Sequence, residues 1–146
     1  MEIVRITDTQ GHLINADLLA RAETIHRHLR PQIPAPYLER MKEVFATGAE
    51  MVVAVEAGEP CGVAVFRVTI NTMVGKKIYS EDLVADPNTS VKGVGRFLMD
   101  FLKQEGRERG CASLELESGT QREQAHKFYY REGFAIKAFG FKQPLV

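Results

Sequence analysis

The chain has 146 residues, of which 45% are hydrophobic and 26% charged, as expected for one soluble globular domain with a buried core. Lysines and arginines number 19 and acidic residues 19, so the basic excess typical of nucleic-acid-binding proteins is absent and we expect no nucleic-acid partner. No signal peptide and no apolar stretch of membrane-spanning length is recognisable, so we expect a cytoplasmic protein with no membrane partner.

Both cysteines, Cys61 and Cys111, lie in apolar stretches. A disulfide framework needs more cysteines and a secreted chain. We therefore interpret both as small buried hydrophobic residues.

The first half of the chain begins with the periodicities of one strand and two helices. Residues 2–7 form a short apolar-alternating run, which predicts a strand. Between residues 14 and 29, apolar side chains recur at spacings of three and four, which predicts a helix that ends before Pro31. Pro36 suits the first turn of a second helix, which Gly48 closes.

Two apolar runs then predict a β-hairpin. The runs cover residues 51–55 and 62–70, and residues 57–60 lie between them, so we expect a loop longer than two residues. Because both runs are nearly continuous in apolar residues, both faces of these strands should be covered.

The second half alternates strands and helices. Its periodicity predicts a strand over 77–85, a turn at 86–88, an amphipathic helix that ends before Gly110, a strand over 112–117, a helix over 121–132 and a last strand over 134–141. The whole order is β-α-α-β-β-β-α-β-α-β, which favours an α/β (α+β) layer fold with a mixed sheet. Without repeats or linkers, residues 1–146 are predicted to form a single domain.

A glycine loop at residues 90–98 lies between a strand and a strongly amphipathic helix. The N–H groups at such a helix start are unsatisfied, and the helix dipole adds positive charge, so the loop suits a phosphate or pyrophosphate. Arg96 after Gly95 excludes a mononucleotide P-loop, and Leu98 excludes a dinucleotide-binding fingerprint. The alternative is a flexible helix start with no ligand.

A second motif occupies the helix that ends at Gly133. Ala125, Phe128 and Tyr129 share one face at spacings of three and four, which is typical of core packing. The hydroxyl of Tyr129 nevertheless needs a polar partner. Tyr130 lies about a quarter-turn away and is expected to face solvent or a groove.

The glycine loop and the later Ala-x-x-Phe-Tyr-x-x-x-Gly-Phe run of residues 125–134, in this order and spacing, resemble the GNAT superfamily of N-acetyltransferases. The resemblance covers residues 78–141. It implies a central mixed β-sheet with splayed parallel middle strands, flanked by about four helices. Three positions depart from the usual motifs: Ser90 stands in place of Gln or Arg, Val91 in place of a frequent glycine, and Arg122 in place of a frequent asparagine.

The resemblance implies transfer of an acetyl group from acetyl-CoA directly to a primary amine of a small molecule or peptide. The alternative is a non-catalytic acyl-CoA-binding regulatory module on the same fold. The residues expected to contact the coenzyme are Leu83, Val84, Ala85, Lys92, Gly93, Val94, Gly95, Arg96 and Arg122.

Two catalytic residues are expected from the resemblance. Tyr129 matches the family tyrosine and is a candidate proton donor for the departing thiolate. Glu81 is the preferred base; because adjacent strand residues point to opposite faces, at most one of Glu81 and Asp82 should face the acceptor. Glu115 and Glu117, which share a strand face, and a water relay are the alternatives.

The acceptor side is expected to be framed by residues 13–47 and the loop 71–77, which show no clear preference for one amine. His26 and His28 are two apart on a helix and diverge, so we predict no metal site. His126 lies beside the second motif, where it could line the groove or equally lie on the surface. Exposed edge strands make a homodimer possible.

Overall fold

Five strands lie side by side in the order β1-β2-β3-β4-β5. Their bounds in the computed structural model, which describes residues 1–146, are β1 (Glu2–Arg5), β2 (Glu50–Glu56), β3 (Glu59–Asn71), β4 (Gly75–Ala85) and β5 (Ser113–Leu116). The first four strands are antiparallel to their neighbours, whereas β5 is parallel to β4. The predicted mixed sheet is therefore confirmed. The chain forms two compact units, Met1–Glu115 and Leu116–Val146.

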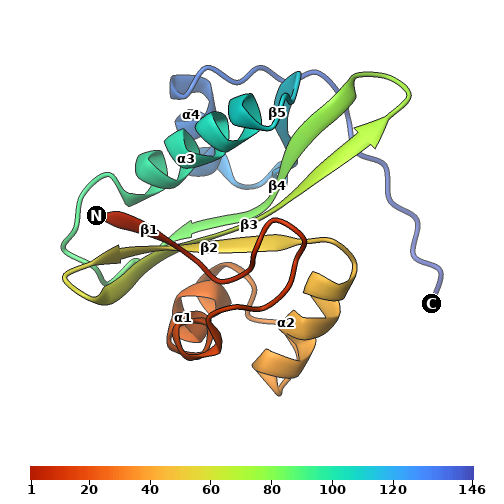
Figure 1. The fold of residues 1–146 in the computed structure, drawn as a ribbon. Helices are drawn as coiled ribbons and strands as arrows, with labels where there is room; N and C mark the ends of the chain where they lie inside the picture. Colours follow the sequence, from red (N-terminus) through yellow and green to blue (C-terminus); the bar gives the residue numbers. More distant parts are fainter. The chain divides into compact units, whose positions relative to one another are not determined.

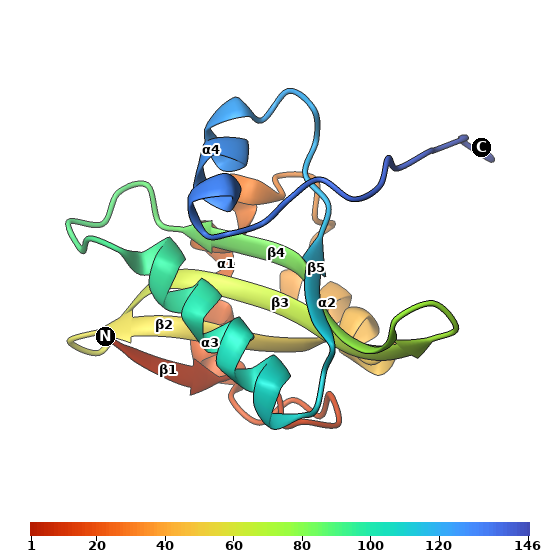
Figure 2. The same cartoon turned by 90° about the horizontal axis from the view of Figure 1, so that it is seen from above.

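In the first unit, helices cover both faces of the sheet (Figures 1 and 2). Helices α1 (Ala16–Leu29) and α2 (Tyr37–Ala46) pack on one face, and α3 (Val94–Glu108) packs on the other. Val53 and Val63 point into the α1/α2 core, whereas Val52 and Ala64 point into the α3 core. This arrangement confirms that both faces of the central strands are covered. None of the helices combines the length and apolar character that crossing a bilayer requires.

The turn between β2 and β3 is tighter than the sequence predicts. Glu56 pairs with Glu59, which leaves only Ala57 and Gly58 in the turn. Both turn residues have positive φ angles, of 51° and 81°, which is the conformation of a two-residue type I′ turn. The expected longer loop is wrong because a register shift between Ala54 and Val55 absorbs the extra residue.

The loop between β3 and β4 is also shorter than predicted, because the two strands extend further. Their ladder continues to the pair Asn71 and Gly75, so the loop is only residues 72–74 rather than 71–77. The Asn71 side chain accepts hydrogen bonds from the N–H groups of Met73 and Val74, at 3.0 and 2.8 Å, and thereby supplies the turn.

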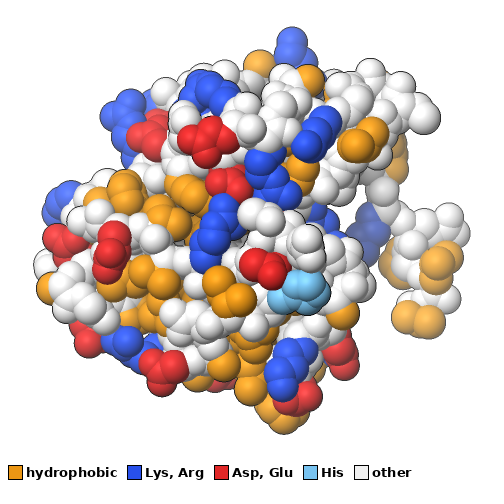
Figure 3. All heavy atoms as spheres, viewed as in Figure 1, with side chains coloured by type: hydrophobic (Ala, Val, Ile, Leu, Met, Phe, Trp, Pro, Cys, Tyr) orange, Lys and Arg blue, Asp and Glu red, His pale blue; other side chains and the backbone are white.

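Four charged side chains tie the C-terminal part of α3 to β1 and β2. Arg5 donates to Glu105 at 2.5 Å, and Arg109 donates to Glu50 at 2.7 Å. Glu50 is buried, and that burial raises its pKa even though Arg109 opposes the shift. On the face seen in Figure 3, acidic and basic side chains are interspersed, in line with the zero net charge.

The second unit contains α4 (Glu123–Arg131) and an extended C-terminal segment. Phe128, Tyr129 and Phe134 make edge-to-face ring contacts, with centroids 5.6 and 5.9 Å apart. The predicted last strand over 134–141 is wrong, because residues 134–146 form neither helix nor strand. A strand needs a hydrogen-bonded neighbour, and no complete strand lies within this unit.

Gly62 permits α3 to approach β3 closely. A Cβ atom built there would lie 2.5 Å from Val94 Cγ1 and 3.0 Å from Leu98 Cδ1. We predict that Gly62→Ala lowers the free energy of unfolding by about 1–3 kcal/mol, because overpacking displaces the helix. Urea denaturation measures the change. Gly140→Ala makes the same chemical change where the nearest atom is 3.7 Å away, and it should have little effect; equal losses in both variants would contradict the packing argument.

Candidate functional site

The start of α3 presents backbone N–H groups that the protein itself does not use. Gly93 precedes the helix in a left-handed conformation, with a φ of 77°, and no side chain caps the helix. The first helical bond runs from the Phe97 N–H to the Gly93 carbonyl at 2.9 Å. No hydrogen bond within the chain uses the N–H groups of Lys92, Gly93, Val94 or Gly95. Together with the helix dipole, these donors form an anion-binding arrangement.

The segment before Gly93 is held in place by local hydrogen bonds. The N–H of Asn88 donates to the Asp86 carboxylate at 2.9 Å, and the N–H of Val91 donates to the Thr89 hydroxyl at 3.2 Å. The N–H of Asp86 donates to the Cys61 carbonyl and so continues the β3–β4 ladder. The free donors at the start of α3 therefore stand at a defined distance from the end of β4.

The last residues of β4 lie beyond the end of its parallel neighbour. The Ala112 N–H donates to the Lys76 carbonyl at 2.7 Å, which sets the start of β5 beside the start of β4. Because β5 has only 4 residues and β4 has 11, Leu83, Val84 and Ala85 extend past it. These three residues pair with β3 on one side only. Their outer edge therefore has no strand partner, and the expected contact of these residues with the coenzyme stays a prediction.

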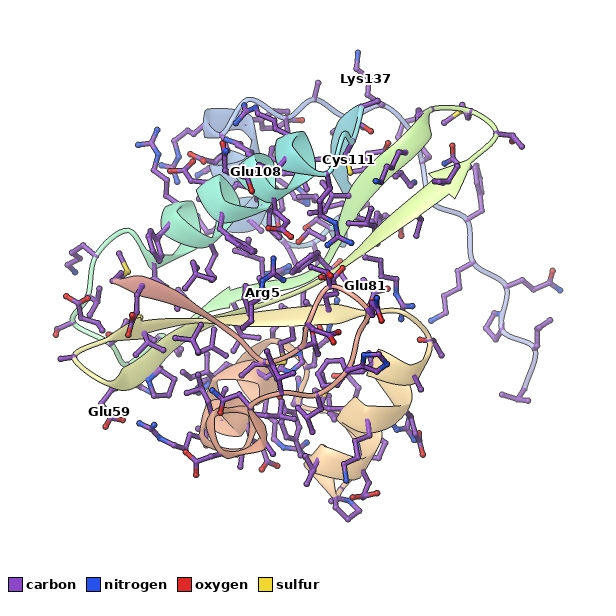
Figure 4. The ribbon with its side chains drawn as sticks, viewed as in Figure 1. Arg5, Glu59, Glu81, Glu108, Cys111 and Lys137 are labelled. Atoms are coloured by element: carbon purple, nitrogen blue, oxygen red, sulfur yellow. The ribbon has the colours of Figure 1, made fainter.

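A β-bulge in β4 brings two carboxylates onto one face of the sheet. Val65 pairs with Asp82 and Phe66 with Ser80, so Glu81 is the extra residue between them. Its carboxylate forms a short ion pair with Arg67, whose guanidinium also donates to the Thr47 carbonyl at the end of α2. Glu81 lies beside the segment joining α2 to β2 (Figure 4).

Asp82 faces the same α1/α2 side. Its carboxylate contacts His26 at 2.8 Å and Arg30 at 2.6 Å, and both partners belong to or end α1. The expectation that at most one of Glu81 and Asp82 faces this side is therefore wrong. Simple alternation assumes a regular strand, and the bulge adds one residue to the count.

The surroundings of Asp82 stabilise its charged form. Burial by itself would raise the pKa, but hydrogen bonds from His26 and Arg30 outweigh it and hold the pKa of Asp82 below its ordinary value. His26 is 1% exposed and also contacts the Tyr37 hydroxyl at 2.9 Å. Burial raises the pKa of Tyr37, so its phenol keeps its proton.

Sequence reasoning treated His26 only as a possible metal ligand and so missed its contact with β4. A signal was present, because His26 stands four residues after Ala22 and next to Ile25 on the apolar face of α1. Only the packing of α1 against β4 reveals its partner. His28 is exposed, so the predicted divergence of the two histidines is confirmed.

The alternative base Glu115 is already engaged. Ser113 donates to its carboxylate at 2.6 Å and Lys77 at 3.2 Å, and these contacts, Ser113 foremost, lower the pKa of Glu115. The neighbouring Glu117 lies in the second unit and is exposed. Both cysteines are free thiols; Cys61 is buried as interpreted from the sequence, whereas Cys111 is only half-buried.

The second unit carries the predicted residues Arg122, His126 and Tyr129, whereas Arg96 lies in the first turn of α3. Tyr129 is partly buried between Phe128 and Phe134, whereas Tyr130 is exposed as predicted. The His126 ring contacts the Gly119 carbonyl at 2.8 Å, so it secures the loop before α4. A shallow hollow at the start of α4 is lined by Gln121, Arg122, Glu123, Gln124 and Ala125.

Residues 18–134 match the Acetyltransferase (GNAT) family. The chain belongs to this family. It is 32% identical over 114 residues to the uncharacterized N-acetyltransferase YhdJ of Bacillus subtilis, and the match covers 75% of this chain and 78% of that protein. It is also 32% identical over 65 residues to the aminoalkylphosphonate N-acetyltransferase of Salmonella typhimurium, covering 44% of this chain and 42% of that protein.

The fold also resembles that of solved structures. The aminoglycoside N-acetyltransferase AAC(6')-Iy in complex with CoA has a TM-score of 0.78 and 17% identity, and the match covers 99% of this chain and 95% of that chain. From the family match and the Bacillus relative, the protein is an N-acetyltransferase, and family membership implies the use of acetyl-CoA.

The depressed pKa of Asp82 predicts a pH dependence of stability. A carboxyl whose folded pKa lies below its unfolded value stabilises the fold above the unfolded pKa, about 3.9, and loses this contribution as the pH falls through the folded value. We predict that the free energy of unfolding of the wild type exceeds that of Asp82→Asn by about 1–3 kcal/mol near neutral pH. This difference in stability should become smaller below about pH 4. Urea denaturation across this range measures the difference; a difference that grows on acidification would contradict the assignment.

Proposed function

We propose that the protein transfers an acetyl group from acetyl-CoA directly to a primary amine of a small molecule or peptide. The observation that carries this proposal is the arrangement along β4 and α3: unused N–H donors at the start of α3 lie close in sequence to a carboxylate pair presented by β4. Relatives support the acceptor class, since the Salmonella protein is named for aminoalkylphosphonates and AAC(6')-Iy for aminoglycosides.

Acetyl-CoA would be held by the residues predicted from the sequence. The N–H groups from Lys92 to Gly95 suit the pyrophosphate, because they combine free donors with the positive end of the helix dipole. The side chains of Lys92 and Arg96, next to these N–H groups in the sequence, are exposed. Leu83, Val84 and Ala85 suit the pantetheine arm, and Arg122 is assigned to the same coenzyme. The Ser90 position is exposed, and the backbone donors are independent of its side chain.

The chemistry needs three actions from the protein. Glu81 accepts the proton that the acceptor ammonium must lose before its nitrogen attacks the thioester carbonyl. The N–H of Leu83 or Val84 stabilises the negative charge that develops on the carbonyl oxygen. Tyr129 donates its phenolic proton to the sulfur as the carbon–sulfur bond breaks. Arg67, paired with Glu81, orients the carboxylate.

The two units are proposed to act as one N-acetyltransferase domain. The family match runs from residue 18 to residue 134 and so includes parts of both. Glu81 belongs to the first unit and Tyr129 to the second. A cytoplasmic location and a homodimer remain predictions from the sequence.

If the loop before α3 binds the coenzyme, a substitution at Gly93 should weaken CoA binding, whereas an equally destabilising substitution elsewhere should not. Gly93→Ala places a side chain at a φ of 77°, so it should destabilise the fold by about 1–2 kcal/mol and weaken CoA binding about tenfold by displacing the donors. Gly110→Ala is the matched control, because Gly110 follows α3 with a φ of 72° and also has open space around it. Isothermal titration with CoA distinguishes them. Equal weakening by both variants would remove the loop from the coenzyme site.

The role of Tyr129 predicts a selective loss of turnover. In an assay of CoA thiol release from acetyl-CoA with a panel of primary amines, Tyr129→Phe should lower kcat about 100-fold, because the proton donor is lost. CoA affinity should be retained. The exposed neighbour provides the control, since Tyr130→Phe removes the same hydroxyl one position away and should leave kcat near wild type. Full activity of Tyr129→Phe would contradict the proposed proton transfer.

A further inference from the structure

A chain of polar contacts runs through the otherwise apolar core between the sheet and helices α1 and α2. The Tyr37 hydroxyl contacts His26 Nδ1 at 2.9 Å, and His26 Nε2 contacts Asp82 Oδ2 at 2.8 Å. Tyr37 and His26 are both buried, at 4% and 1% exposure. Buried polar groups of this kind add little stability compared with apolar packing, so their value lies in the orientation that they impose.

The direction of the hydrogen bonds follows from the chemistry of the partners. An ionised carboxylate only accepts, so His26 Nε2 must carry a proton and donate it to Asp82. When the imidazole carries its single proton on Nε2, Nδ1 has a lone pair that can accept a hydrogen bond from the Tyr37 O–H. The phenol is suited to this role because burial raises its pKa. Each group therefore fixes the next, and the chain ends at the Asp82 carboxylate.

The Asp82 carboxylate still has acceptor capacity. Oδ2 accepts a hydrogen bond from His26, and Oδ1 accepts one from Arg30 Nε at 2.6 Å. A carboxylate has about four lone-pair directions, so it can accept further hydrogen bonds. Its side chain is 14% exposed, so it reaches the surface. Arg30 also donates to the Glu81 carbonyl at 3.1 Å and thereby holds the bulge. Asp82 is thus a fixed anion next to the proposed base.

We propose that Asp82 binds the ammonium group of the acceptor and that His26 is a positioning residue which acts through Asp82. The inference rests on the proposed function and assigns different tasks to the two carboxylates: Glu81 takes the proton, and Asp82 stays charged throughout. The lowered pKa of Asp82 supports this assignment, since a general base benefits from a pKa nearer neutrality. The acceptor class is a primary amine that arrives as a cation.

Two amines of similar size test the assignment. Ethylamine is a cation at neutral pH, whereas 2,2,2-trifluoroethylamine is mainly neutral. With Asp82→Asn, we expect the KM for ethylamine to rise about 10- to 100-fold, because a charge-assisted hydrogen bond is lost. The KM for the fluorinated amine and the KM for acetyl-CoA should change little. An unchanged KM for ethylamine, or an equal fall of kcat for both amines, would overturn the assignment.

Variants of His26 test the positioning role. His26→Leu should raise the KM for ethylamine several-fold with kcat retained, and His26→Gln, whose amide N–H replaces the Nε2 donor, should restore part of the loss. His28→Leu is the control, because His28 is exposed on the same helix and makes no contact with Asp82. Thermal unfolding verifies that each variant folds. Equal KM values for the Leu and Gln variants at position 26 would overturn the role of the donor.

A binding measurement separates this inference from the proposed function. In ¹⁵N-labelled wild type, the His26 ring should show a proton on Nε2, and ethylammonium chloride should shift that signal in a saturable way when CoA is present. Saturable binding without acetyl transfer would count against the proposed function and keep the binding role of Asp82. An Nδ1–H tautomer, or no response to ethylammonium, would overturn the inference whether or not transfer occurs.

Discussion

The β-bulge at Glu81 is the constraint on which the candidate site depends. In a regular strand, Glu81 and Asp82 would point to opposite faces, and one of them would enter the α3 core. With one extra residue, both reach the α1/α2 side, where Arg67 and Arg30 balance their charges. The bulge thus avoids burying an unpaired carboxylate, which would cost several kcal/mol, and it creates a surface carrying two anions of different character.

The same sheet also positions the N–H donors at the start of α3, because α3 packs against it. Gly62 removes a side chain from β3 where Val94 and Leu98 of α3 make their closest approach. At the other end of the helix, the ion pairs of Arg109 with Glu50 and of Arg5 with Glu105 hold α3 against β1 and β2. With both ends fixed, the free N–H groups that follow Gly93 have a defined position relative to the end of β4. A ligand-binding loop on a rigid helix needs little ordering when it binds.

The core around His26 shows how a catalytic fold uses polar groups sparingly. The α1/α2 core is mostly apolar, and the contacts of His26 with Tyr37 and Asp82 are among its few polar ones. Each member satisfies its neighbour, so the buried groups are not left without partners. What the arrangement provides is a carboxylate of fixed direction at the surface, a property that a flexible exposed aspartate lacks.

The sequence by itself determined the order of the elements as far as α4, the covering of both sheet faces and the two motifs that resemble the family. These features are local: apolar periodicity follows from helix and strand geometry, and a glycine before a helix is visible without knowing the fold. Only the tertiary structure decided that Glu81 and Asp82 share a face and that His26 contacts Asp82 across 56 positions. The bulge depends on the register of two strands, and the histidine contact depends on the packing of α1, neither of which one strand's sequence pattern encodes. The missing strand over 134–141 has the same cause, since alternating side chains form a strand only when another strand supplies the hydrogen bonds.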